Sequence, residues 1–191
     1  MEQFDSGTCC FTGYRPHRFA FTPDGLRPEQ VQCVLGRQIR RLYDGGCRTF
    51  ITGMCAGVDL WAADEVLTLS RSRGDVRLIA AIPFEGQAAR WPLPLQREYR
   101  RILNGCAQRV VLFSPEQAEQ DAAACYRQRN RWMVDRSSTV LAVYTPDATD
   151  IRSGTAATVR YARRQQRHIV YIHPATLAVS EESVHQLRFP L

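Results

Sequence analysis

Three short segments of this sequence combine glycine with a hydroxyl side chain in a way that suits anion binding. They are Thr12-Gly13-Tyr14-Arg15, Thr52-Gly53-Met54-Cys55-Ala56-Gly57-Val58-Asp59 and Ser153-Gly154-Thr155. Each lies where an apolar run gives way to a probable helix, and the free backbone N–H groups at such a junction bind phosphate. We therefore expect a phosphate-binding set made of Thr12, Gly13, Thr52, Gly53, Gly57, Ser153, Gly154 and Thr155, with Arg15 as the neutralising cation.

Two carboxylates could take part in chemistry beside these loops. Asp59 belongs to the first turn of the helix that follows the second loop, and Glu85 follows another apolar run in Pro83-Phe84-Glu85-Gly86-Gln87. Either one could meet a ribose hydroxyl or act as a general base. Each also has a plain structural alternative, because a helix dipole favours Asp59 where it stands and Glu85 suits an exposed surface. Cys55 is expected to be a small packing residue.

Several common cofactor and metal sites are not predicted. The sequence contains neither the G-x-G-x-x-G dinucleotide fingerprint nor a G-K-[ST] phosphate loop. It has seven cysteines but no C-x-x-C pair, and its four histidines do not cluster with them. We predict reduced thiols, no metal site and, apart from a nucleotide-type ligand, no cofactor.

These loops must be positioned by regularly alternating strands and helices. Apolar runs predict strands at 8–12, 48–52, 76–82, 108–113, 138–144 and 168–172, and helical patterns lie at 28–43, 58–73, 93–103, 119–135 and 155–166. The strand candidates are continuously apolar, which is typical of strands covered on both faces. We therefore predict an α/β fold with a mostly parallel sheet of about six strands and helices on both faces. No linker is evident, so residues 1–191 are expected to form one Rossmann-like domain.

Composition narrows the class of protein. The net charge is +6, and all 25 basic residues are arginines, which bind phosphate bidentately. Arginine-rich helix faces at 127–135 and 160–167 are candidate contacts for nucleic acid, although the spacing of Arg131 and Asp135 also predicts an ion pair within one helix. No apolar run is long enough to cross a membrane, and the first residues lack the features of a signal peptide. We expect a cytoplasmic protein with no membrane partner.

The ordered set of segments resembles the SLOG superfamily, the Rossmann-like group that joins the Smf/DprA proteins to the LOG proteins. The closest branch looks like the YpsA-type proteins of uncharacterised function. The first two loops and Ser153-Gly154-Thr155 carry the likeness, together with Pro83-Phe84-Glu85-Gly86-Gln87, Trp91 and Arg129-Asn130-Arg131-Trp132-Met133-Val134-Asp135. The likeness spans residues 8 to about 172.

The resemblance implies a nucleotide-type ligand at the carboxyl ends of the strands. LOG proteins are phosphoribohydrolases with a P-G-G-x-G-T-x-x-E loop. The corresponding stretch here, Ile151 to Thr158, keeps one of the three glycines, Gly154, and places Thr158 where the glutamate would be. The resemblance therefore argues for binding more firmly than for hydrolysis, and Glu85 or Asp59 would have to replace the lost carboxylate.

Three hypotheses follow from these observations. The first is a protein that binds a nucleotide or a nucleotide derivative, with N-glycosidic hydrolysis as an added activity. The second is a DprA-like module for single-stranded nucleic acid, and the third is a ligand-sensing regulator that acts through partners. SLOG relatives often self-associate, so a homo-oligomer is compatible with each.

Overall fold

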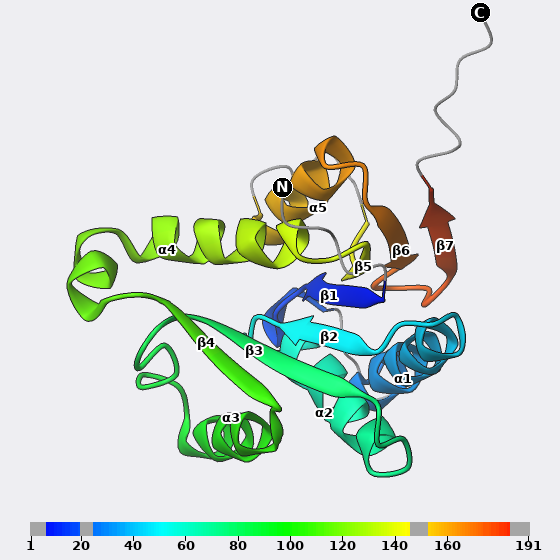
Figure 1. Cartoon of the computed structure of the whole chain (residues 1–191), viewed down its shortest axis with the longest axis horizontal. Coiled ribbons are helices and arrows are strands. Elements are labelled where there is room, and N and C mark those ends of the chain that lie inside the picture. The colour runs from blue at the N-terminus through cyan, green and yellow to red at the C-terminus, as the bar shows by residue number, and fades with distance from the viewer. Residues whose placement is uncertain (1–6, 20–24, 146–152, 184–191) are drawn as a thin grey trace, which may run out of the picture.

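The computed structural model describes residues 7–19, 25–145 and 153–183. Within this part, seven strands form one sheet in the order β4-β3-β2-β1-β5-β6-β7 (Figure 1). The strands are β1 (Thr8–Gly13), β2 (Thr49–Thr52), β3 (Arg77–Phe84), β4 (Gln108–Phe113), β5 (Thr139–Val143), β6 (His168–Ile172) and β7 (Val179–Glu182). Neighbouring strands are parallel except β6 and β7, which are antiparallel. The predicted α/β fold with a mostly parallel sheet is confirmed.

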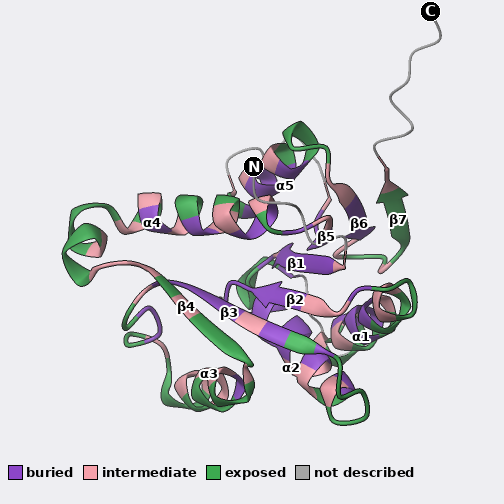
Figure 2. Cartoon of the chain, in the orientation of Figure 1, coloured by how far each residue is buried: buried purple, intermediate pink, exposed green. Residues whose placement is uncertain are grey.

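Helices cover both faces of this sheet. They are α1 (Pro28–Asp44), α2 (Val58–Ser70), α3 (Leu93–Gly105), α4 (Pro115–Asp135) and α5 (Gly154–Arg164), and a short 3-10 helix η1 (Pro16–Arg18) follows β1. Helix α2 packs against α1 and α3 on one face, whereas α4 and α5 pack together on the other (Figure 1). The central strands are therefore buried from both sides, as their continuous apolar runs predict (Figure 2).

The elements differ from the sequence prediction at three places. Strand β7 and helix η1 were not predicted, and α4 begins four residues earlier than expected, at Pro115. Ser114 caps that helix by accepting a hydrogen bond from the Gln117 N–H at 3.4 Å. The backbone of Asp121 is not helical, and its carboxylate accepts a bond from the Ala124 N–H at 2.8 Å, which starts the helix again. The helix therefore has two parts, and the second part leads to the site.

The order in which the chain adds strands reverses in the middle of the sheet, between β1 and β5. From β1 the chain moves outward through β2, β3 and β4, and then returns to β5 on the other side of β1. The loops after β1 and β5 therefore leave toward opposite faces of the sheet. Such a switch point opens a crevice at the carboxyl ends of the strands, where open α/β sheets bind ligands.

No helix among the described residues is long and apolar enough to cross a membrane.

Candidate functional site

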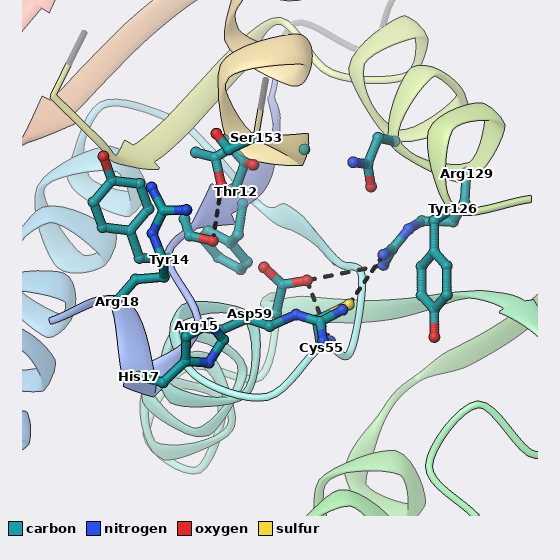
Figure 3. A pocket seen from close by; sticks show the side chains of 15 residues that line it. Thr12, Tyr14, Arg15, His17, Arg18, Cys55, Asp59, Tyr126, Arg129 and Ser153 are labelled. Carbon is teal, nitrogen blue, oxygen red and sulfur yellow. Dashed lines mark hydrogen bonds and ion pairs between the residues drawn. The ribbon is translucent and has the colours of Figure 1, made fainter. Parts of the chain in front are cut away.

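A cavity of about 300 Å³ lies at this switch point (Figure 3). Its walls come from β1 and the loop that follows it, the loop before α2, the second part of α4 and the first turn of α5. The lining residues are Phe11, Thr12, Gly13, Tyr14, Arg15, His17, Arg18, Cys55, Asp59, Tyr126, Arg129, Asn130, Ser153, Gly154 and Thr155. Seven of the predicted site residues are in this set, whereas Thr52, Gly53, Gly57 and Glu85 are not.

The loops after β1 and β2 fit closely against one another. A Cβ atom added to Gly13 would lie 2.6 Å from Val58 Cγ2, and one added to Gly57 would lie 2.7 Å from the carbonyl oxygen of Tyr14. Gly57 also has a φ of +94°, which favours glycine. The Val58 N–H donates to the Tyr14 carbonyl at 3.4 Å. In the described structure, Gly57 therefore allows one loop to pack on the other and does not itself face the cavity.

Gly53 has a different neighbour, the guanidinium of Arg129. A Cβ atom at position 53 would lie 1.6 Å from Arg129 Nη1 and 2.6 Å from Asp59 Oδ2. The adjacent Thr52 serves the same loop, since its hydroxyl donates to the Asp59 carbonyl at 2.9 Å and accepts from the Met54 N–H at 3.1 Å. Thr52 and Gly53 thus do not line the cavity but contact Asp59 and Arg129, which do.

That floor is a buried cluster of Arg129, Asp59 and Cys55 (Figure 3). Arg129 Nη1 lies 3.8 Å from Asp59 Oδ2, and the two side chains are 3% and 10% exposed. Arg129 Nη2 donates to Cys55 Sγ at 3.2 Å, and the Cys55 N–H donates to Asp59 Oδ2 at 3.3 Å. Arg129 Nε is buried and has no hydrogen-bond partner among the described residues. Cys55 is half-buried and lines the cavity.

Burial and charge act against each other in this cluster. Burial raises the pKa of Asp59 above its ordinary value, although Arg129, the Cys55 N–H and Arg15 each lower it. Burial works against the charge on Arg129, but Cys55 and Asp59 outweigh it and raise the pKa of the guanidinium. Arg129 is therefore positively charged, and Asp59 is its ion-pair partner.

The first turn of α5 forms the opposite wall. Ser153 caps this helix by accepting a hydrogen bond from the Ala156 N–H at 3.0 Å. The Thr155 hydroxyl donates to the Gly13 carbonyl at 3.0 Å and ties the helix to β1. The Ser153 carbonyl accepts from the Ala157 N–H. Gly154 and Thr155 stand in the first turn of α5, where backbone N–H groups have no partner within the helix.

Thr158 stands where the LOG pattern has glutamate, and it is engaged in this structure. Its hydroxyl donates to the Gly154 carbonyl at 2.8 Å and accepts from Asn130 Nδ2 at 2.9 Å. The threonine therefore joins α5 to α4 and presents no carboxylate to the cavity. Residues 151 and 152 of the same stretch lie outside the described residues.

The other proposed carboxylate, Glu85, lies away from the cavity. It forms an ion pair with Arg109, and both side chains are about half exposed. The neighbouring Gln87 is buried instead, and its amide donates to the Met54 carbonyl at 3.3 Å. The loop after β3 thus braces the loop after β2 and leaves Glu85 at the surface.

Eight of the fifteen lining residues were absent from the predicted set: Phe11, Tyr14, His17, Arg18, Cys55, Tyr126, Arg129 and Asn130. Arg129 and Asn130 belong to the segment that carries the family resemblance, which was the available signal for them. Tyr126 packs edge-on against Phe84 and offers an aromatic surface on the α4 wall. Tyr14 is only 8% exposed and packs against Phe19 and Tyr144.

The cavity carries positive charge. Arg15, Arg18 and Arg129 line it, and Asp59 is the one carboxylate among the described lining residues. Together with the two backbone N–H groups of α5, these side chains suit an anionic ligand. No group of three or more histidine, cysteine or acidic residues suited to a metal occurs in the described ranges.

Comparison with known proteins bears on the family. Residues 9–177 match the family model YpsA, described as the YspA SLOG family. A UPF0398 protein of Oceanobacillus iheyensis is 28% identical over 68% of this chain and 69% of its own length. The UPF0398 protein YpsA of Bacillus subtilis is 23% identical over 84% of this chain and 88% of its own length. The resemblance predicted from the sequence is confirmed.

Two solved structures share the fold. DNA processing protein A (DprA) from Streptococcus pneumoniae aligns with a TM-score of 0.56 and 20% identity over 90% of this chain, which covers 52% of that protein. DprA from Helicobacter pylori, described with its single-stranded DNA binding mode, aligns with a TM-score of 0.55 and 17% identity, over 95% of this chain and 71% of its own. At these identities the likeness concerns the fold.

Proposed function

The chain belongs to the YpsA family of SLOG proteins, and we propose that it binds a nucleotide or a nucleotide derivative in the cavity beside Arg129. The observation that carries the proposal is the convergence of three arginines and the first turn of α5 on one crevice at the switch point of the sheet. Arg15 and the N–H groups of Gly154 and Thr155 would hold a phosphate. Tyr126 would contact the base.

Binding is a better match to this site than N-glycosidic hydrolysis. Thr158 holds α4 and α5 together and cannot serve as a carboxylate, and Glu85 does not line the cavity. Asp59 is the remaining acid, but it is already paired with Arg129 and the Cys55 N–H. A general base needs free access to the proton that it accepts. We therefore propose a binding protein, in which Asp59 positions Arg129.

A thermal-shift screen with nucleoside monophosphates, followed by calorimetric titration, tests this proposal. A ligand present at 100 times its dissociation constant stabilises the folded state by about 2.7 kcal/mol. We expect Arg15→Gln to weaken binding about tenfold or more, because it removes a charge-assisted contact to phosphate. Arg37→Gln is the matched control, since Arg37 is exposed on α1 and does not line the cavity. No stabilisation by any nucleotide would overturn the proposal.

Single-stranded DNA is a second candidate ligand. The described binding mode of the Helicobacter pylori DprA and the net charge of +6 favour it. Binding through phosphates should weaken steeply with salt. Fluorescence anisotropy of a labelled single strand at low and moderate salt would detect this, and the absence of binding at low salt would exclude it.

A further inference from the structure

A second hollow continues from the cavity between α4 and α5. It encloses about 220 Å³, and it shares Asn130 and Gly154 with the cavity. Its lining residues are Arg127, Asn130, Arg131, Gly154, Ala157, Thr158, Arg160, Tyr161 and Arg164. We call it the α4–α5 groove, and the two helices that form it lie side by side in Figure 1. A ligand in the cavity could extend into it past Asn130.

The charge of the groove is strongly one-sided. Four of its nine lining residues are arginines, and none of the nine is acidic. Arg127 forms an ion pair with Asp121 at 3.4 Å, but both side chains are more than half exposed, so this pair contributes little. The predicted pair between Arg131 and Asp135 is not present among the described residues. Asp135 instead accepts a hydrogen bond from the Tyr161 hydroxyl at 2.7 Å.

Tyr161 holds two of these arginines in place. The guanidinium carbons of Arg131 and Arg164 lie 5.5 and 5.8 Å from the centre of its ring. Within the ranges that the structure describes, neither arginine has a carboxylate at ion-pair distance, so their N–H groups are available to an anion. Because the ring already carries these guanidinium groups, it is not a bare platform for a base. The chemistry of the groove therefore fits phosphate.

We propose that the α4–α5 groove is a second phosphate-binding subsite, which receives a phosphate that the ligand carries beyond the nucleotide held in the cavity. This inference rests on the proposed function and narrows the ligand to a nucleotide extended through a phosphate linkage. A dinucleotide joined by pyrophosphate and a short single strand share that chemistry. Asn130 and Gly154 lie at the junction of the two hollows.

Calorimetric titration with three probes tests the subsite. The probes are adenosine monophosphate, diadenosine diphosphate and a single-stranded adenylate tetranucleotide. We expect the double variant Arg131→Gln/Arg164→Gln to bind at least one extended probe about tenfold more weakly and to bind the monophosphate within twofold of the wild-type affinity. Arg163→Gln is the matched control, because Arg163 is on the same helix but pairs with Glu182 and does not line the groove.

The outcomes separate this inference from the proposed function. Weakened binding of diadenosine diphosphate supports a small dinucleotide, and weakened binding of the tetranucleotide alone supports a strand. For a strand, the slope of the salt dependence should also fall by about 0.7 for each phosphate that the variant no longer neutralises. If the double variant binds every probe as the wild type does, the inference is wrong while the cavity proposal stands. If the wild type binds the monophosphate but neither extended probe, the inference is also wrong; if it binds no probe and no nucleotide stabilises it in the thermal-shift screen, both are wrong. Unfolding in urea verifies that the variants fold.

Discussion

The guanidinium of Arg129 lies directly against the backbone of Gly53, at a distance that excludes any side chain at position 53. A Cβ atom there would be 1.6 Å from Arg129 Nη1. A residue of the loop after β2 and a residue of α4, distant from each other in the chain, therefore depend on each other. The glycine that first suggested a phosphate turn is needed to seat a buried cation.

Gly53→Ala should destabilise the protein by about 3 kcal/mol or more, because Arg129 must leave its position and Asp59 loses its partner. Urea unfolding followed by circular dichroism measures the change. Gly154→Ala is the matched control, since a Cβ there would meet no atom within 4 Å, and it should change stability by less than about 1 kcal/mol. Equal stability of the two variants would contradict the role assigned to Gly53.

Arg129 and Asp59 should show strong energetic coupling. Either Arg129→Met or Asp59→Asn leaves a buried charge without its partner, and we expect each to cost about 3–5 kcal/mol. The double variant should be less destabilised than the sum of the two, by about 1–3 kcal/mol. A double-mutant cycle from urea unfolding gives this value, and strict additivity would show that the two side chains do not stabilise each other.

The stability of Arg129→Met should depend on pH through Asp59. Burial raises the pKa of Asp59 and Arg129 lowers it, so removing Arg129 should raise that pKa further. A carboxyl whose pKa is higher in the folded state binds its proton there first, so stability falls as pH rises above the ordinary value of 3.8. We expect the deficit of Arg129→Met relative to the wild type to grow between about pH 4 and pH 7. Urea unfolding midpoints measured across this pH range test the prediction. In the double variant Arg129→Met/Asp59→Asn the deficit should not change with pH, and a deficit of Arg129→Met that is constant with pH would contradict the prediction.

The thiols should differ widely in reactivity. Burial raises the pKa of Cys10 and of Cys106 to about 12, and it also raises the pKa of Cys9, whereas Cys33 is exposed. With a disulfide reagent near neutral pH, we expect Cys33 to react early and Cys9 and Cys10 to be protected until the protein unfolds. All seven cysteines should react in denaturant. Mass spectrometry identifies the labelled sites, and labelling of Cys10 as fast as Cys33 would contradict the buried position of β1.

Six strands could be predicted because each contains an apolar run. Five of them are central and covered on both faces, whereas β4 lies at the edge of the sheet and none of its residues is fully buried. Strand β7 could not, since three of its four residues, Ser180, Glu181 and Glu182, are polar. It pairs antiparallel with β6, and Arg41 and Arg163 from other parts of the chain form ion pairs with its two glutamates. Such long-range ion pairs leave no local pattern in a sequence.

The sequence indicated where in the fold the candidate site lies better than it indicated which side chains line it. Glycine followed by a helix start indicates a tight loop, but it does not say whether a ligand or a neighbouring loop needs the space. A Cβ atom at position 154 would meet no atom within 4 Å, whereas one at Gly13 or Gly57 would meet Val58 or Tyr14. Arg129 was hard to single out, because α4 carries several arginines and only the packing of that helix reveals which one is buried.

The two glutamates of β7 place charged groups at one edge of the sheet. Glu181 pairs with Arg41 and lies 3.4 Å from His168 Nε2, and Glu182 lies 3.0 Å from Arg163 Nε. A strand from another molecule that approached this edge would meet charged groups already engaged with their own chain. Charged edges of this kind discourage strands from adding on. The folded protein is therefore protected at β7 against aggregation by sheet extension.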